Sequence, residues 1–308
     1  MPPTSSLASR LYPYDWLVAG FCLLLITLAL ALGRPLVDYT AQLALYGSVI
    51  LLIVVIVQFA DARAGGVQGF LRLLYPVLLF GLFYRSMGGM VFLFSDGFFD
   101  WQLTTFEHMI LGVNPTLYID QHLLSVRLNE LFSLCYLSYY LMVPGLFIVL
   151  YVRKEYDFIR RALTAICLAF FLSYVMFILY PIEGPRFHFA NEFIHDVAGP
   201  LFRPLTEFVI TNGAFHGGCM PSSHVAVALV VMFYGFRLSR AAGLALLPVT
   251  VGLAIGTVWG RYHYVSDVVA GAAIGVLAYV LVLKYYDAWS GAGGREPART
   301  ETRTEYVT

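Results

Sequence analysis

Charged residues are scarce in this chain of 308 residues: only 12% are Asp, Glu, Lys or Arg, whereas 59% are hydrophobic. Soluble domains carry about 25% charged and about 45–50% apolar residues, so this composition excludes a cytosolic enzyme and a disordered chain. The nineteen basic and nineteen acidic residues cancel, so no net positive charge attracts nucleic acid. Cysteine is also rare, and four scattered residues exclude a disulfide scaffold. We therefore predict an all-α integral membrane protein.

Long apolar runs predict about eight transmembrane helices, because a span needs about 20 mostly apolar residues. The runs are residues 16–33, 40–60, 70–94, 130–152, 161–180, 222–238, 241–259 and 265–286. The first run has an alternative interpretation as a signal peptide, since Ala29-Leu30-Ala31 has the small residues of a cleavage site. Its apolar stretch is longer than the usual hydrophobic region of such a peptide, which favours a span.

The positive charges predict how the spans are oriented. With the N-terminus inside, thirteen of the nineteen Lys and Arg residues fall on one side and five on the other, and Arg85 lies within the third span. Positive residues stay cytoplasmic, so both termini are expected in the cytoplasm. Polar residues at the opposite span ends are then expected on the outer face.

Two outer segments are long enough to contribute to a site. Residues 95–129 place Trp101 and Phe106 among polar residues, which predicts a helix lying in the membrane interface. Residues 181–221 contain prolines and paired glycines, which predict a loop with one short helix. The tail, residues 289–308, is predicted to be disordered and cytoplasmic.

Polar residues that can carry chemistry gather in three clusters at the outer span ends, namely residues 180–188, 216–224 and 257–267. In the third cluster, His263 and Asp267 are four residues apart and share one face of a helix. An Asp that accepts a hydrogen bond from one imidazole nitrogen frees the other as a nucleophile or base. The alternative is an interfacial histidine beside a helix-capping aspartate.

The second cluster predicts a helix start that binds an anion. Pro221 favours a first helical turn, and Ser222 or Ser223 can cap it or donate to an oxyanion. Free N–H groups at a helix start bind anions, and Gly218 lets a ligand approach the backbone. His224 is then within reach of the bound group. The alternative is an ordinary capped helix start with a partly exposed histidine.

In the first cluster, Arg186 lies on the side that generally avoids cations, and its planar fork suits two phosphate oxygens. The alternative is a lipid-headgroup anchor. Taken together, His224, His263, Asp267 and the arginines Arg186 and Arg261 have the composition of a phosphoryl-transfer site without a metal. One histidine attacks phosphorus and the other protonates the leaving oxygen.

The three clusters, in this order, resemble the three motifs of the type 2 phosphatidic acid phosphatase superfamily, which also includes the vanadium haloperoxidases. Pro221-Ser222-Ser223-His224 is similar to the family's Pro-Ser-x-His motif, and His263 with Asp267 to its His-x-x-x-Asp motif. The resemblance implies a phosphohistidine nucleophile at His263 oriented by Asp267, with His224 as general acid. It also implies a six-helix catalytic core over residues 70–288, preceded by two additional helices in residues 1–69.

Departures from the common motifs resemble one branch, the inositolphosphorylceramide synthases. Leu179 stands where the first motif commonly has Lys, and Phe187 follows Arg186 where Pro is common. Thr257 replaces the usual Arg of the third motif, and Arg261 is a candidate replacement cation. The segment 107–116 is also similar to an outer-loop feature of that branch.

We therefore expect a lipid phosphotransferase that passes a phosphoryl or phosphodiester group from a membrane lipid to a polyol or lipid alcohol, or a lipid phosphate phosphatase that passes it to water. A transporter is a third interpretation, because charges within spans often mark permeation paths. No cofactor and no metal are expected. The sequence does not indicate the oligomeric state. The candidate headgroup-pocket residues are Glu107, His108, Arg127 and His188. The alternative is that Glu107, His108 and Arg127 only decorate an interfacial helix.

Overall fold

The computed structural model describes residues 10–32, 39–60 and 66–290. Within these residues the chain forms twelve α-helices and no strand, which confirms the all-α prediction. The helices are α1 (Pro13–Leu32), α2 (Tyr39–Phe59), α3 (Gly66–Met87), α4 (Asp100–Leu111), α5 (Pro115–His122), α6 (Val126–Val152), α7 (Tyr156–Leu179), α8 (Pro185–His188), α9 (Phe202–Gly213), α10 (Ser223–Leu238), α11 (Arg240–Trp259) and α12 (Val265–Trp289). Nearly all of the tail predicted to be disordered lies outside the described residues.

Each of the eight predicted apolar runs is a helix. Among the described residues, seven helices are long and apolar enough to cross a membrane, and the protein is an integral membrane protein. The eighth, α10, has 16 residues and packs against α6, α7, α11 and α12. It is the centre of the bundle.

Small residues allow the helices around α10 to approach closely. A Cβ atom added at Gly271 of α12 would lie 2.3 Å from the carbonyl oxygen of Ser222, and one at Gly275 would lie 2.5 Å from that of Ala226. Such small-residue contacts are the usual means of tight helix packing in membranes. They hold the start of α12 against the start of α10, where two of the three motifs lie.

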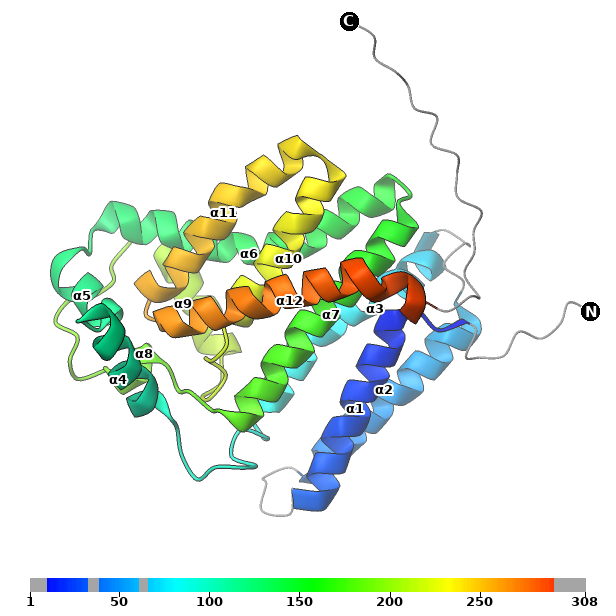
Figure 1. Ribbon diagram of the computed structural model, residues 1–308, viewed down its shortest axis with the longest axis horizontal. Helices are drawn as coiled ribbons and strands as arrows, with labels where there is room; N and C mark the ends of the chain where they lie inside the picture. Colours follow the sequence, from blue (N-terminus) through cyan, green and yellow to red (C-terminus); the bar gives the residue numbers. More distant parts are fainter. Residues whose placement is uncertain (1–9, 33–38, 61–65, 291–308) are drawn as a thin grey trace, which may run out of the picture.

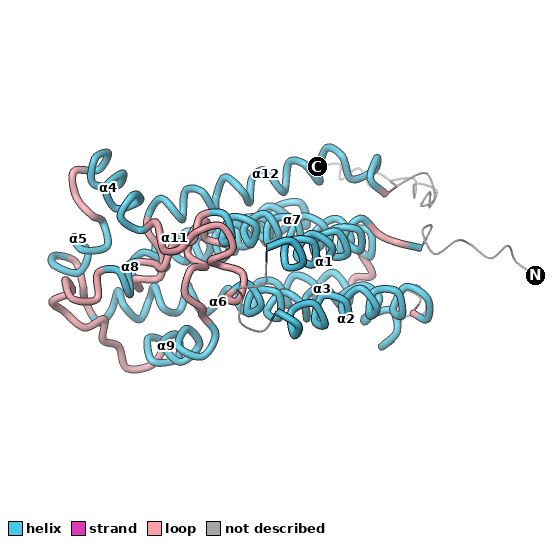
Figure 2. The backbone as a smooth tube through the Cα atoms, turned by 90° about the horizontal axis from the view of Figure 1, so that it is seen from below, coloured by secondary structure: helices cyan, strands magenta, loops and turns pink. Residues whose placement is uncertain are grey.

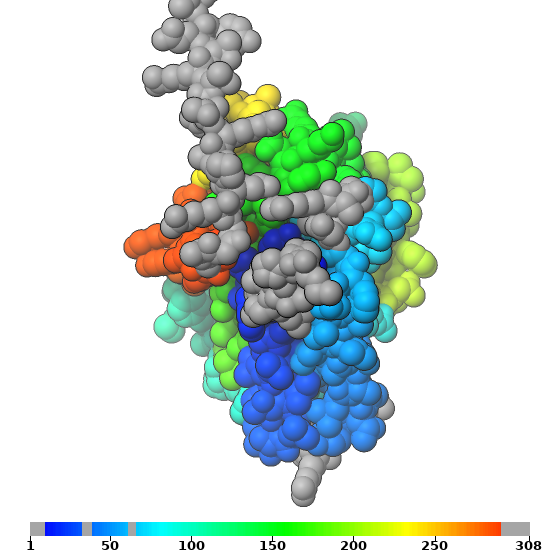
Figure 3. All heavy atoms as spheres, turned by 90° about the vertical axis from the view of Figure 1, so that its right-hand side faces the viewer, coloured from blue at the N-terminus to red at the C-terminus, as the bar shows by residue number. Residues whose placement is uncertain are grey.

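The helices α1 and α2 lie side by side next to the core (Figure 3). A buried ion pair fastens α1 to α3, with 2.6 Å between Asp15 Oδ2 and Arg72 Nη2. Phe21 of α1 also stacks on Phe171 of α7, with ring centroids 4.4 Å apart. Figure 1 shows the start of α1 near the end of α12, away from the short helices α4, α5 and α8.

The short helices gather at one end of the molecule (Figure 2). The outer segment 95–129 holds two helices, α4 and α5, where one interfacial helix was predicted. Residues 181–221 hold α8 and α9, although only one short helix was expected. Helix α9 is amphipathic, with polar residues between its apolar ones, so it forms no continuous apolar run.

The third span ends earlier than predicted. Helix α3 stops at Met87, whereas the apolar run continues to residue 94. Gly88 and Gly89 follow Met87 directly, and glycine favours termination over helix propagation. The chain therefore turns there.

Candidate active site

The three polar clusters meet at one place in the fold, between the end of α7, the start of α10 and the turn from α11 to α12. The Cys219 backbone N–H donates to the Ile182 carbonyl at 3.3 Å, joining the first cluster to the second. The Ser222 N–H donates to the Asp267 carbonyl at 2.9 Å, joining the second to the third. Backbone hydrogen bonds thus bring together residues up to 85 positions apart.

His263 and Asp267 form a buried pair in the third cluster. His263 Nδ1 lies 3.3 Å from Asp267 Oδ2. The same oxygen accepts the backbone N–H of Tyr264 at 2.8 Å, so Asp267 also caps α12. With Nδ1 directed at a carboxylate, the proton belongs on Nδ1 and the lone pair on Nε2. The predicted contact is present, but the two residues do not share a helix face, because His263 lies in the turn before α12 and only Asp267 is helical.

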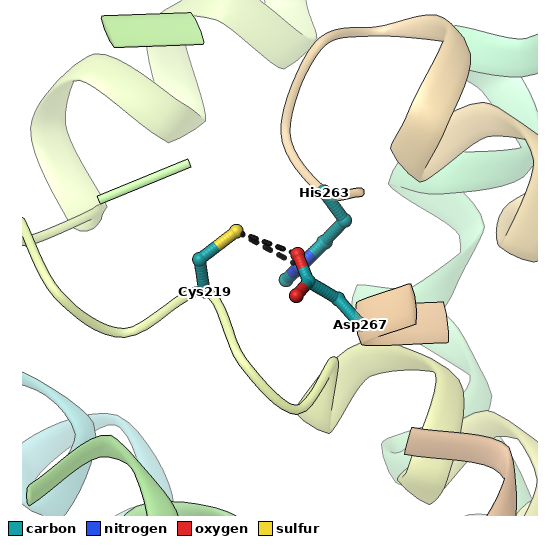
Figure 4. A group of neighbouring side chains, drawn as sticks. All are labelled: Cys219, His263 and Asp267. Carbon is teal, nitrogen blue, oxygen red and sulfur yellow. Dashed lines mark hydrogen bonds and ion pairs between the residues drawn. The ribbon is translucent and has the colours of Figure 1, made fainter. Parts of the chain in front are cut away.

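Cys219 is a third member of this cluster that the sequence interpretation missed, because a lone cysteine in a loop carries no motif. Figure 4 shows its thiol directed toward His263 and Asp267. Sγ donates to Asp267 Oδ2 at 2.9 Å and lies 3.4 Å from His263 Nδ1. Burial, followed by the nearby Asp267 carboxylate, raises the pKa of the Cys219 thiol well above its usual value. The thiol is therefore protonated and able to donate.

His224 lies in the first turn of α10, and its ring centroid is 6.0 Å from that of His263. Its Nε2 is 3.2 Å from the hydroxyl of Tyr136 on α6. Its buried Nδ1 has no hydrogen-bond partner among the described residues. Two imidazoles at this separation can both reach a single phosphoryl group, and catalytic contacts of this kind tighten when substrate binds.

The start of α10 is the predicted capped helix terminus. The Ser222 hydroxyl accepts the backbone N–H of Val225 at 3.4 Å, and both Ser222 and Ser223 are buried. The first N–H groups of a helix have no intrahelical acceptor, so those of Ser223 and His224 remain available to an anion. Gly218 fits closely under Phe215, since a Cβ atom there would lie 2.4 Å from the ring.

Arg186, at the start of α8, forms an ion pair with Glu207 of α9. Its second terminal nitrogen, Nη1, is buried without a partner among the described residues. Arg203 also binds Glu207, at 3.0 Å, and hydrogen-bonds to the hydroxyl of Tyr262. Burial opposes ionisation of Glu207, but the hydrogen bond and charge of Arg186 outweigh it and lower the pKa of Glu207. Arg203 and Glu207 were not predicted as site residues.

Arg261 directs its guanidinium away from the two histidines. It pairs with Asp120 of α5 and donates to the backbone carbonyl of His195. Its guanidinium carbon lies 3.8 Å from the centre of the Phe193 ring. In this structure Arg261 therefore joins α5 and the segment before α9 to the turn that carries His263.

The four candidate headgroup residues lie in different environments. Glu107 is buried and accepts the backbone N–H of Ser266 at 2.6 Å, so its side chain caps α12. Burial raises the pKa of Glu107. His108, Arg127 and His188 are exposed and are not brought together with the histidine pair by any hydrogen bond among the described residues.

Asp100, at the start of α4, connects the first and third clusters and was also not predicted. Its Oδ2 accepts the backbone N–H of Glu183 at 2.8 Å, and its Oδ1 accepts that of Gly184 at 2.8 Å. The Tyr264 hydroxyl donates to Oδ1 at 2.9 Å. Gly184 has a φ of +104°, a backbone conformation that glycine adopts readily. Asp100 thus holds the turn that precedes Arg186.

A cavity of about 380 Å³ adjoins the site between α3, α6, α7, α9 and α10. Its wall is mostly apolar and aromatic, and includes Tyr84, Tyr136, Tyr139, Tyr140, Ser223 and His224. Arg85 of α3 also reaches the cavity wall and donates to the carbonyl of Asn212 at 2.7 Å. Of the two histidines, His224 lines this cavity, and His263 is not among the described residues of its wall.

Comparison with known families gives one match: the model of the PAP2 superfamily matches residues 102–281, more than half of the chain. The match includes all three clusters and extends from α4 into α12. No curated protein and no solved structure matches. The match favours the enzyme interpretation over the transporter.

Proposed function

The chain belongs to the PAP2 superfamily, and from this membership we propose that it is a membrane lipid phosphotransferase. It moves a phosphoryl or phosphodiester headgroup from a lipid donor to an alcohol acceptor. The group passes through a covalent phosphohistidine at His263. The observation that carries the proposal is the pairing of buried His263 with half-buried His224, 6.0 Å apart between ring centroids, beside an apolar cavity.

In the first step, Nε2 of His263 attacks phosphorus and the bond from phosphorus to the leaving alcohol oxygen breaks. His224 gives its proton to that oxygen as it leaves. Asp267 supports the step because its carboxylate holds the Nδ1 proton and faces the ring as positive charge develops. In this step His224 is the protonated ring, and the Tyr136 hydroxyl oxygen accepts its Nε2 proton, which leaves the Nδ1 proton to be given to the leaving oxygen.

The negative charge of the phosphoryl group requires donors aimed at its oxygens. Nη1 of Arg186 is a buried donor without a partner among the described residues, and it supplies one such contact. Ser222, Ser223 and the free N–H groups at the start of α10 supply others. Gly218 was expected to leave room for the phosphoryl group, but the Phe215 ring fills the space on its Cβ side.

In the second step, His224, now deprotonated, removes a proton from the acceptor hydroxyl, whose oxygen attacks phosphorus and releases His263. An alcohol acceptor must compete with water, which is present at about 55 M, and a well-oriented acceptor reaches effective molarities of about 10⁵ M or more. The aromatic wall around His224 keeps water scarce, which favours the alcohol.

A lipid phosphate phosphatase is the second candidate, because the same residues hydrolyse the intermediate if water reaches it. The side chain of Arg186 is 30% exposed, so the outer edge of the site is open to solvent. This observation favours hydrolysis. The residues in contact with His263 and His224 act identically in both reactions.

The excess of positive charges on one side of the spans supports cytoplasmic termini and an active site on the outer face. An epitope placed after residue 308 is then expected to react with antibody only after the membrane is permeabilised.

The product distinguishes the two candidates. Purified protein in lipid nanodiscs receives phospholipid with a labelled headgroup phosphate and a panel of polyol and lipid alcohol acceptors, with inositol first. We expect acceptor-dependent labelled lipid in excess of free phosphate, and neither product from His263→Ala. If free phosphate is the only labelled product across the whole panel, the protein is a phosphatase.

A further inference from the structure

Three potential metal ligands, Cys219, His263 and Asp267, lie together in one buried cluster (Figure 4). We propose that this cluster is an inhibitory binding site for Zn²⁺ and similar thiophilic divalent ions. The metal is not part of the catalytic cycle. Binding itself is independent of the proposed function, whereas its inhibitory effect rests on that function, because the ion occupies the ring that attacks phosphorus.

The distances between the ligand atoms suit a tetrahedral zinc ion. Cys219 Sγ is 2.9 Å from Asp267 Oδ2 and 3.4 Å from His263 Nδ1, and the latter two atoms are 3.3 Å apart. Zinc bonds of about 2.3 Å to sulfur and about 2.0–2.2 Å to nitrogen and oxygen place tetrahedral ligands about 3.3–3.6 Å apart. The two distances to His263 Nδ1 already lie within about 0.2 Å of this range, whereas Sγ and Oδ2 must separate by about 0.6 Å to admit the ion.

A second observation points to a ligand at the same place. Asp267 Oδ2 accepts three hydrogen bonds, but the other carboxylate oxygen, Oδ1, is buried without a partner among the described residues. A buried carboxylate oxygen without a partner is costly. A metal ion that Asp267 binds through both carboxylate oxygens relieves this cost.

The charges of the cluster also suit a divalent cation. Binding releases the Cys219 thiol proton, and the resulting thiolate and the Asp267 carboxylate together balance the two positive charges of Zn²⁺. His263 remains neutral, because its ring proton leaves Nδ1 and a proton is taken up at Nε2. One proton is released overall, and the metal-bound cluster has no net charge, which suits a buried site.

Inhibition follows from the change of tautomer. Coordination takes the lone pair of Nδ1 and leaves Nε2 protonated, and a protonated Nε2 has no lone pair with which to attack phosphorus. Zinc therefore inactivates the nucleophile without filling the phosphate site. Removal of the ion by a chelator restores the reactive tautomer.

Cobalt spectroscopy tests the binding directly, since a cysteine thiolate bound to Co²⁺ gives a charge-transfer absorption band. Co²⁺ is titrated into the detergent-solubilised, full-length protein, into Cys219→Ser and into Cys135→Ser. Serine keeps a hydroxyl donor to Asp267 but supplies no thiolate. Cys135 is a matched control, because it lies half-buried on α6 and packs beside Gly252.

We expect a saturable band of one ion per chain in the wild type and in Cys135→Ser, displaced by Zn²⁺. In Cys219→Ser we expect no band and an affinity for Zn²⁺ reduced by more than the roughly 10–100-fold that follows loss of an outer-shell partner. Absence of a band in the wild type, or an undiminished band in Cys219→Ser, would overturn the proposal.

An activity measurement tests the inhibitory effect separately. The turnover of each variant in Zn²⁺ is divided by its own turnover in chelator, so that a change in basal rate does not enter. We expect turnover in Zn²⁺ to be at least tenfold lower than turnover in chelator for the wild type and Cys135→Ser. For Cys219→Ser we expect the two rates to be nearly equal. Equal zinc sensitivity of all three proteins would contradict inhibition at this cluster. If the protein transfers no phosphoryl group at all, the proposed function fails while the cobalt titration still decides the metal site.

Discussion

The substitution Asp267→Asn separates two tasks of this carboxylate, the orientation of His263 and the electrostatic support of its ring. Oδ2 accepts hydrogen bonds from His263, Cys219 and Tyr264, whereas Oδ1 has no partner among the described residues. An asparagine therefore fits with its carbonyl oxygen in place of Oδ2 and its NH₂ group in place of Oδ1. All three hydrogen bonds persist, and His263 keeps its proton on Nδ1.

The charge is what this substitution removes. A hydrogen bond to a charged group contributes about 1.5–3 kcal/mol, against about 0.5–1.5 kcal/mol between neutral groups. The difference, about 1–2 kcal/mol, applies when the ring of His263 becomes positive. Because about 1.4 kcal/mol corresponds to a factor of ten in rate, kcat is expected to fall about 5- to 30-fold.

The assay measures the first turnover of labelled phospholipid by the protein in nanodiscs. Asp267→Ala is the matched variant, because it loses orientation as well as charge, and it is expected to fall further than Asp267→Asn. Melting temperatures check that both variants are folded. The reasoning fails if Asp267→Asn is as inactive as His263→Ala, since the amide NH₂ would then face the ring and reverse its tautomer. It also fails if kcat is unchanged.

Four further results are expected. His263→Ala abolishes turnover in a folded protein, because the covalent route is lost, and substantial remaining activity would contradict the phosphohistidine. Arg186→Lys lowers kcat about 10²–10³-fold, since an ammonium cannot reproduce the planar fork, and single-turnover rates measure the loss. Activity survives excess chelator and is blocked by vanadate, whereas loss in chelator with rescue by Mg²⁺ would assign charge neutralisation to a metal. Tyr136→Phe lowers kcat about tenfold through loss of one hydrogen bond to His224, and an unchanged rate would exclude Tyr136 from positioning that ring.

Features that depend on short stretches of sequence were predictable. Each apolar run became a helix, because the cost of exposing backbone groups to lipid leaves few other structures for such a run. The pairing of His263 with Asp267 was predicted from their four-residue spacing, although His263 lies in the turn before α12 and only Asp267 lies on the helix. The capping role of Ser222 followed from its place directly before an apolar helix.

The remaining parts of the site were not predictable, because their partners are distant in sequence. Asp100 accepts hydrogen bonds from residues more than 80 positions away, and Glu207 pairs with Arg186 across 21 positions and a loop. Nothing in the local sequence of either carboxylate specifies that partner. For Arg261, its nearness in sequence to His263 suggested a phosphate contact. Its guanidinium instead pairs with Asp120, 141 positions earlier, and the local sequence does not specify this distant partner.

The exposure of the site falls over a short distance, and this gradient suits a polar acceptor, either water or a soluble alcohol. At the outer edge, His216 is 56% exposed and contacts Glu183, and Arg186 is 30% exposed. At the base, His263 is 5% exposed and His224 adjoins the apolar cavity. A lipid donor brings its chains along an apolar surface, whereas a water-soluble polyol needs polar partners as it approaches. A reaction that joins these two substrates needs an apolar approach for the donor and a polar approach for the acceptor, and the proposed function assigns these to the cavity beside His224 and to the exposed edge at Arg186 and His216.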